Sequence, residues 1–183
     1  MRAICINVLG ALAVAIVLLA GTACGGGEAA PKRLTLAWYG DSITADGHQA
    51  ARISAPEFDV QDFSVGGKHS DSPLSPLDTA DVVVIRYGMA DAAHGLTPAM
   101  TRANVLNLLA LVQAQGRRAI VINVSATPTC LECATNAALA DLTDIDVSGV
   151  PVVTLDGIHP DEASYARLAE YIHAALVRLL LKD

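Results

Sequence analysis

Short apolar runs alternate with longer amphipathic segments along most of this chain, and that alternation constrains its fold more than any other feature. Five runs have the length and apolar content of strands: 34–39, 58–63, 81–87, 119–124 and 152–155. Consecutive parallel strands need long crossovers, usually helices that cover both faces of the sheet. The pattern therefore predicts an α/β fold with three layers, a doubly wound parallel sheet of about five strands between helices.

The helical signals lie mainly in the second half of the chain. Thr97 and Pro98 are typical of an N-cap followed by proline at the first helical position, and this helix is expected to end near Gln115. A short helix is predicted over 134–142, and a last helix begins near Pro160. The first two connections are short, so little helical cover is expected beside them.

The N-terminus has the pattern of an export signal. Arg2 precedes an apolar run, and small residues follow before Cys24. This pattern resembles a bacterial lipoprotein signal with Cys24 as the acylated residue, although simple cleavage after Ala23 or an uncleaved membrane anchor is also compatible with it. The chain is expected to be exported, either as a periplasmic or cell-envelope lipoprotein that meets the membrane through its N-terminal lipid anchor, or as a secreted protein. The expected divisions are a signal peptide, a Gly-rich tether and one folded domain: 1–23, 24–32 and 33–183.

Charge limits the partners of this chain. It has 12 Lys and Arg against 19 Asp and Glu, for a formal net charge of -7, and no basic cluster. Nucleic-acid binding draws much of its free energy from counterions released by Lys and Arg. A nucleic-acid partner is therefore not expected.

Cys130 and Cys133 form a C-x-x-C pair. Two thiolates are too few for a structural zinc site, so no metal is expected there. In an exported protein the pair is predicted to form a small loop disulfide. A thioredoxin-like redox site is the alternative, but that motif opens a helix after an early strand, whereas this pair lies late in the chain.

Residues suited to catalysis follow the predicted strands. Ligands of such sheets bind beyond the carboxyl ends of the strands. Ser42 follows the first strand, a loop with Gly67 the second, and Asp156 and His159 the fifth. A serine hydroxyl becomes a nucleophile when an imidazole takes its proton, as His159 would do, while Asp156 holds the imidazole tautomer. Each residue alone also has an ordinary role as a helix cap or turn residue.

These segments resemble the motifs of the SGNH, or GDSL, hydrolase family. Its Gly-Asp-Ser motif matches 40–42, and its Asp-x-x-His motif matches Asp156 and His159. The resemblance extends from Leu34 to the last helix and implies a sheet in flavodoxin-like order, with no metal or organic cofactor. The implied activity is hydrolysis of small carboxylic esters through an acyl-enzyme on Ser42, with His159 as base and then acid.

The resemblance also assigns an oxyanion hole, and here the chain departs from the family. The N–H groups of Ser42 and Gly67 are the implied donors, but Ala90 occupies the position of the family's asparagine. Loss of one such donor costs about 10²–10³ in rate. His69 and His94 follow the second and third strands and are candidate replacements.

Short early connections leave little chain for a lid, so the expected substrate is a small ester or an acylated sugar in an open pocket. Two alternatives remain at this stage. One is a catalytically degenerate protein that binds a glycan or an envelope partner, and the other is an acyltransferase that uses the same triad.

Overall fold

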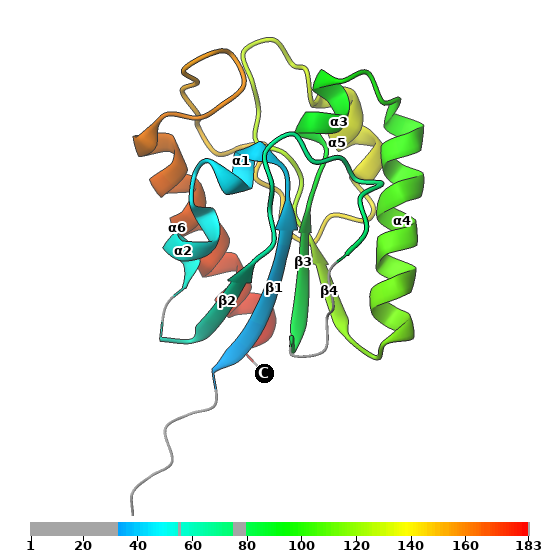
Figure 1. Ribbon diagram of the computed structural model, residues 1–183. Helices are drawn as coiled ribbons and strands as arrows, with labels where there is room; N and C mark the ends of the chain where they lie inside the picture. The colour runs from blue at the N-terminus through cyan, green and yellow to red at the C-terminus, as the bar shows by residue number, and fades with distance from the viewer. Residues whose placement is uncertain (1–32, 55, 75–79, 183) are drawn as a thin grey trace, which may run out of the picture. The chain divides into compact units, whose positions relative to one another are not determined.

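The computed structural model describes residues 33–54, 56–74 and 80–182 (Figure 1). The predicted signal peptide, the tether and Cys24 lie outside this part of the chain. Within it, no helix is both long enough and apolar enough to cross a membrane.

Four strands form one parallel sheet in the order β2-β1-β3-β4. Trp38 at the centre of β1 pairs with Asp62 of β2 on one side and Val84 of β3 on the other. The predicted α/β class and parallel sheet are confirmed, and the strand order is that of the first four strands of a flavodoxin-like sheet. The strands are β1 (Leu34–Gly40), β2 (Phe58–Asp62), β3 (Val82–Arg86) and β4 (Arg118–Val121).

Within the described residues, six helices connect and flank these strands. As expected, helical cover is thin around the first two strands, where α1 and α2 are four and five residues long. The predicted cap of the long fourth helix is present, since Thr97 Oγ1 accepts a hydrogen bond from the Met100 N–H at 3.2 Å. The helices are α1 (Ser42–Ala45), α2 (Gln49–Ile53), α3 (Met89–Ala93), α4 (Pro98–Ala114), α5 (Cys133–Leu139) and α6 (Glu162–Leu180).

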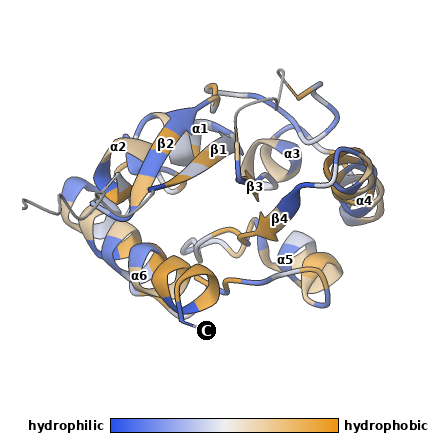
Figure 2. Cartoon of the chain, turned by 90° about the horizontal axis from the view of Figure 1, so that it is seen from below, coloured by the Kyte–Doolittle hydropathy of each residue, from blue (hydrophilic) through white to orange (hydrophobic). Residues whose placement is uncertain are grey.

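Alternate strand residues pack on opposite faces of the sheet. Leu36 and Trp38 of β1 pack with α2 and α6, while Ala37 and Tyr39 lie on the face covered by α4. Figures 1 and 2 show the strands between α2 and α6 on one side and α4 on the other. Each of these four residues is at most 1% exposed. Because β1 is packed on both faces, it can place the residue that follows it accurately.

The prediction of a strand at 152–155 is wrong. This segment pairs with its own continuation, with an isolated antiparallel bridge between Thr154 and Pro160. The Val153 N–H donates instead to Ser164 Oγ at 2.9 Å. Directly after β4, Ile122 forms a single parallel bridge with Ile145, which occupies the position expected for the fifth strand. The sheet of the described chain therefore has four strands, and 152–155 forms one arm of a hairpin-like loop.

Candidate active site

Ser42 is placed by an abrupt change from strand to helix. β1 ends at Gly40 and α1 begins at Ser42, with Asp41 as its N-cap. A Cβ on Gly40 would lie 2.6 Å from Thr44 Oγ1 and 2.9 Å from the Arg86 carbonyl oxygen. Only glycine fits this turn, because any side chain would collide with backbone of β3 and with α1.

Asp41 is buried beneath the nucleophile and links two helix starts. Its Oδ1 accepts a hydrogen bond from the Ile43 N–H at 3.1 Å, and its Oδ2 accepts from the N–H groups of Met89 and Ala90, each at 3.0 Å. Burial raises the pKa of this carboxyl, while these hydrogen bonds and the charge of Arg86 act in the opposite direction. Asp41 thereby holds α1, which carries Ser42, against the first turn of α3.

His159 and Asp156 lie on the loop that replaced the predicted fifth strand. The Leu155 N–H donates to the His159 carbonyl at 2.8 Å, which closes the loop. Asp156 Oδ1 accepts hydrogen bonds from the N–H groups of Ile158 at 2.9 Å and His159 at 2.7 Å. The carboxylate therefore organises the same turn whose imidazole it contacts.

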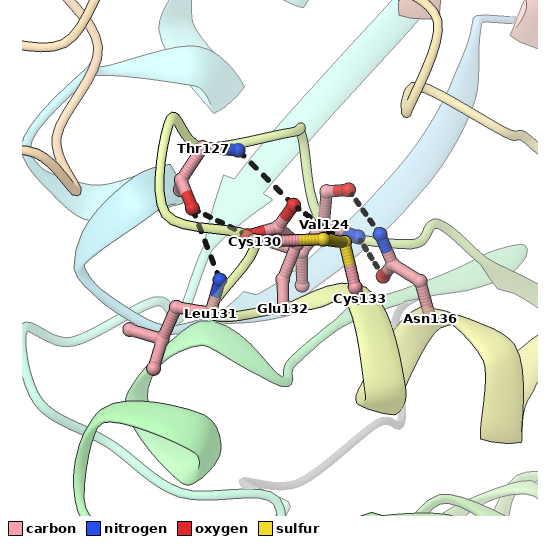
Figure 3. Close-up of a disulfide and its surroundings, with 7 residues drawn as sticks. All are labelled: Val124, Thr127, Cys130, Leu131, Glu132, Cys133 and Asn136. Carbon is pink, nitrogen blue, oxygen red and sulfur yellow. Dashed lines mark hydrogen bonds between the residues drawn. A yellow bond between two sulfur atoms is a disulfide. The ribbon is translucent and has the colours of Figure 1, made fainter.

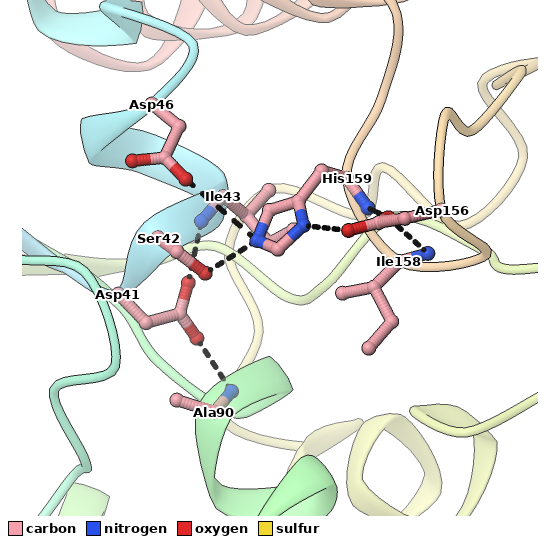
Figure 4. Close-up of polar contacts among 8 residues, drawn as sticks. All are labelled: Asp41, Ser42, Ile43, Asp46, Ala90, Asp156, Ile158 and His159. Atoms are coloured by element: carbon pink, nitrogen blue, oxygen red, sulfur yellow. Dashed lines mark hydrogen bonds and ion pairs between the residues drawn. The ribbon is translucent and has the colours of Figure 1, made fainter.

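The three side chains form a continuous hydrogen-bonded chain (Figure 4). His159 Nε2 lies 2.9 Å from Ser42 Oγ, and His159 Nδ1 lies 2.6 Å from Asp156 Oδ2. The hydrogen bond from the His159 side chain, followed by the backbone donors, holds the pKa of Asp156 far below its usual range. An ionised Asp156 keeps the proton on Nδ1, so Nε2 is free to accept the serine proton.

The loop after β2 brings Gly67 to the same pocket. Gly67 has a φ of +71°, which favours glycine. Asp91 of α3 anchors this loop, because its fully buried carboxylate accepts from the Ser70 N–H at 2.9 Å and from Ser70 Oγ at 2.5 Å. Among the described residues, no intramolecular hydrogen bond occupies the N–H of Gly67 or of Ser42. Both groups remain available to a ligand.

Ala90 lies in the wall of this pocket, and its side chain offers no donor. Of the two candidate replacements, His94 lines the pocket one helical turn after Ala90, whereas His69 is not one of the lining residues. His94 Nδ1 lies 2.8 Å from the Ala90 carbonyl oxygen and 3.1 Å from His69 Nε2. The carbonyl can only accept, so it favours the proton on Nδ1 and leaves Nε2 of a neutral His94 without one.

Ser42, His159, Gly67 and Ala90 line one pocket of about 400 Å³. A larger one of about 540 Å³ lies beside α6, and none of the predicted catalytic residues lines it. We assign the site to the smaller pocket because the hydrogen-bonded serine and imidazole are there. Its arrangement can transfer a proton from a serine hydroxyl and present two N–H donors to a developing oxyanion.

Known proteins resemble this chain in structure. No family model matches its sequence, and no curated protein matches it either. A crystal structure of TesA aligns with 24% sequence identity and a TM-score of 0.60, over 80% of this chain and 99% of that one. A member of the lipolytic protein G-D-S-L family from Veillonella parvula aligns with 13% identity and a TM-score of 0.57, over 82% and 100% of the two chains. This chain has the SGNH hydrolase fold. An acetyl xylan esterase, AlAXEase, aligns with 14% identity and a TM-score of 0.60, over 78% of this chain and 100% of that one.

The C-x-x-C pair lies on the SGNH fold at the start of α5 (Figure 3). Cys130 and Cys133 are joined in a disulfide with a Cα–Cα distance of 5.1 Å. The buried Glu132 between them accepts from the Thr127 N–H at 3.0 Å and Thr127 Oγ1 at 2.6 Å. Within the described chain, the one cluster of metal-ligating side chains consists of Cys130, Glu132 and Cys133. With both sulfurs in the disulfide, the cluster lacks the thiolates that a zinc site needs.

One residue of the candidate site was not predicted from the sequence. Asp46, the C-cap of α1, lines the pocket with its Oδ2 3.7 Å from His159 Nε2. Its position four residues after Ser42 is the signal that was available, because residues one helical turn apart share a face. This signal was too weak to use, because the four residues of α1 are too few to show an amphipathic pattern.

Proposed function

We propose that this protein hydrolyses small carboxylic esters through an acyl-enzyme on Ser42. The observation that carries the proposal is the 2.9 Å contact between Ser42 Oγ and His159 Nε2, with Nδ1 held by Asp156 at 2.6 Å. Nε2 takes the hydroxyl proton while Oγ bonds to the ester carbonyl carbon. The carbon–oxygen bond to the alcohol then breaks, and the alcohol leaves with the proton from Nε2. Water repeats the sequence, releasing the carboxylic acid and restoring Ser42.

The oxyanion would form near the free N–H groups of Ser42 and Gly67. Ala90 supplies no third side-chain donor, and a neutral His94 with its proton on Nδ1 cannot donate from Nε2. The expected enzyme is therefore a serine esterase that operates with two backbone donors. Its kcat is expected to be lower than that of the same site with an amide donor.

A fluorophosphonate probe tests the nucleophile directly. We expect the probe to add to the peptide that contains Ser42 in the wild-type protein, and Ser42→Ala to abolish both this adduct and the turnover of p-nitrophenyl acetate. The readouts are peptide mass spectrometry and release of nitrophenolate. Turnover by the wild type no greater than that of Ser42→Ala would overturn the proposal and favour a binding protein on the hydrolase fold.

Ala90→Asn is expected to raise kcat for phenyl acetate by about tenfold or more, because it restores a side-chain donor beside the oxyanion. Steady-state kinetics at saturating ester provide the measurement. Ala93→Asn is the matched control, since Ala93 lines the same pocket at the end of α3, and this change is expected to give no increase. An equal gain from both variants would contradict a role for the third donor.

The proposed substrates are small acyl esters, with acetyl groups on sugars as one class, and the proposed location is outside the cytoplasm. An open pocket of about 400 Å³ and the structural similarity to an acetyl xylan esterase support the substrate class. Product analysis with and without a sugar acceptor distinguishes hydrolysis from acyl transfer, because transfer forms a new ester in place of the free acid.

A further inference from the structure

Asp46 carries a carboxylate that the triad does not require, and it lies on the path of the leaving group. The Asp46 N–H donates to the Ser42 carbonyl at 2.9 Å, which fixes its backbone relative to the nucleophile. Its Oδ2 lies 3.7 Å from His159 Nε2. Nε2 is the atom that returns the proton to the departing alcohol, so the alcohol must leave close to Asp46.

The Asp46 carboxylate borders both the imidazole and the loop that carries Gly67, since a Cβ on Gly66 would lie 4.0 Å from Asp46 Oδ1. Figure 4 shows Asp46 and Ala90 on opposite sides of the Ser42 hydroxyl. The side chain of Asp46 is 58% exposed, so its charge faces the open mouth of the pocket. The alcohol portion of a bound ester, which receives its proton from His159 Nε2, therefore leaves close to this carboxylate.

Asp46 is the only carboxylate among the residues that line the pocket. None of the pocket-lining residues is Lys or Arg. Asp46 and Asp156 supply the carboxylates nearest to His159. Arg52 of α2 pairs with Glu162 at 2.6 Å and therefore does not offset them. A leaving group with its own negative charge would be repelled at this mouth, whereas a neutral or cationic one would not.

We propose that Asp46 determines specificity by selecting esters of neutral or cationic alcohols against those that carry a carboxylate or phosphate near the scissile bond. This inference rests on the proposed esterase activity and assigns its substrate class. Asp46 acts on the substrate through its charge and takes no part in bond making.

Three phenyl acetates that differ in the para substituent test this inference: 4-acetoxybenzoate is anionic, 4-acetoxybenzamide neutral and (4-acetoxyphenyl)trimethylammonium cationic. Each kcat/KM is divided by the rate constant for hydroxide hydrolysis of the same ester, which removes differences in intrinsic reactivity. At low ionic strength, we expect the wild type to prefer the neutral ester over the anionic one by roughly three- to tenfold, the effect of one charge at several ångströms in a partly solvated site. The cationic ester is expected to be at least as good a substrate as the neutral one.

Asp46→Asn should bring the ratio of neutral to anionic ester close to one, and Asp46→Lys should invert it. Asp59→Asn is the matched control, because it removes the same charge from an exposed position on β2 and is expected to keep the wild-type ratio. Raising the salt concentration to about 0.5 M should reduce the preference of the wild type, since the screening length falls to a few ångströms.

The possible failures have different meanings. A wild-type ratio that persists in both Asp46 variants, or one that changes equally in Asp59→Asn, would overturn the specificity role while the esterase assignment stands. Absence of Ser42-dependent turnover for all three esters would overturn the esterase assignment and this inference with it.

Discussion

His159→Ala is expected to lower kcat for phenyl acetate by about 10⁴-fold, because removal of a triad member leaves the oxyanion donors and substrate binding as the remaining sources of catalysis. His159 Nε2 lies 2.9 Å from Ser42 Oγ, and within the described chain no other side chain is hydrogen-bonded to this hydroxyl. Phenyl acetate is a sharper substrate for this test than p-nitrophenyl acetate, because its less acidic leaving group depends more on the proton from Nε2.

Asp156→Asn is expected to reduce kcat almost as strongly, about 10⁴-fold, because an amide no longer holds the proton on Nδ1. His48→Asn is the control for loss of an imidazole near Ser42 in the sequence. His48 is exposed, its backbone is left-handed with a φ of 46°, and asparagine tolerates that conformation.

Turnover above one tenth of the wild-type value in His159→Ala would be incompatible with general-base catalysis by His159.

Asp41→Ala is expected to lower the free energy of unfolding by about 3 kcal/mol or more, because each buried N–H left without a partner costs about 1–3 kcal/mol. Three such groups, on Ile43, Met89 and Ala90, lose their acceptor. Burial lowers the pKa of Arg86 and the charge of Asp41 raises it, so Asp41→Ala also leaves this buried guanidinium without its opposite charge. Urea unfolding followed by circular dichroism gives the measurement.

Asp71→Ala is the comparison for this prediction, since Asp71 is exposed and its replacement is expected to change stability by less than about 0.5 kcal/mol. Asp41→Asn retains one acceptor oxygen and is expected to fall between the wild type and Asp41→Ala, which keeps the test informative if the alanine variant does not fold. Equal unfolding midpoints for Asp41→Ala and Asp71→Ala would contradict the role of Asp41 in joining α1 to α3.

The sequence predicted the elements whose stability depends on local patterns. Val82-Val83-Val84-Ile85 is apolar throughout and became β3, buried on both faces. Thr97 and Pro98 marked the start of α4 correctly, because an N-cap and a proline at the first turn act within a few residues. The short helices α1, α2 and α3 left no such periodic signal.

The segment 152–155 shows where a local pattern was insufficient. Its apolar residues fit a strand, but Val153 and Leu155 are 59% and 78% exposed. Whether such a run joins a sheet depends on the partner that its N–H groups find. Here Ser164 of α6 and the loop's own His159 carbonyl provide the partners.

The sequence by itself determined which residue types were available for catalysis and their order along the chain: a serine after the first strand, a glycine loop after the second, and an aspartate and histidine before the last helix. It also determined that Ala90 supplies no side-chain donor. Only the tertiary structure decided the 2.9 Å contact between Ser42 and His159, 117 positions apart, and the position of the Asp46 carboxylate beside it. The physical reason is that residue type and helical or strand period are local properties, whereas a distance between remote side chains depends on how the whole sheet and its helices pack.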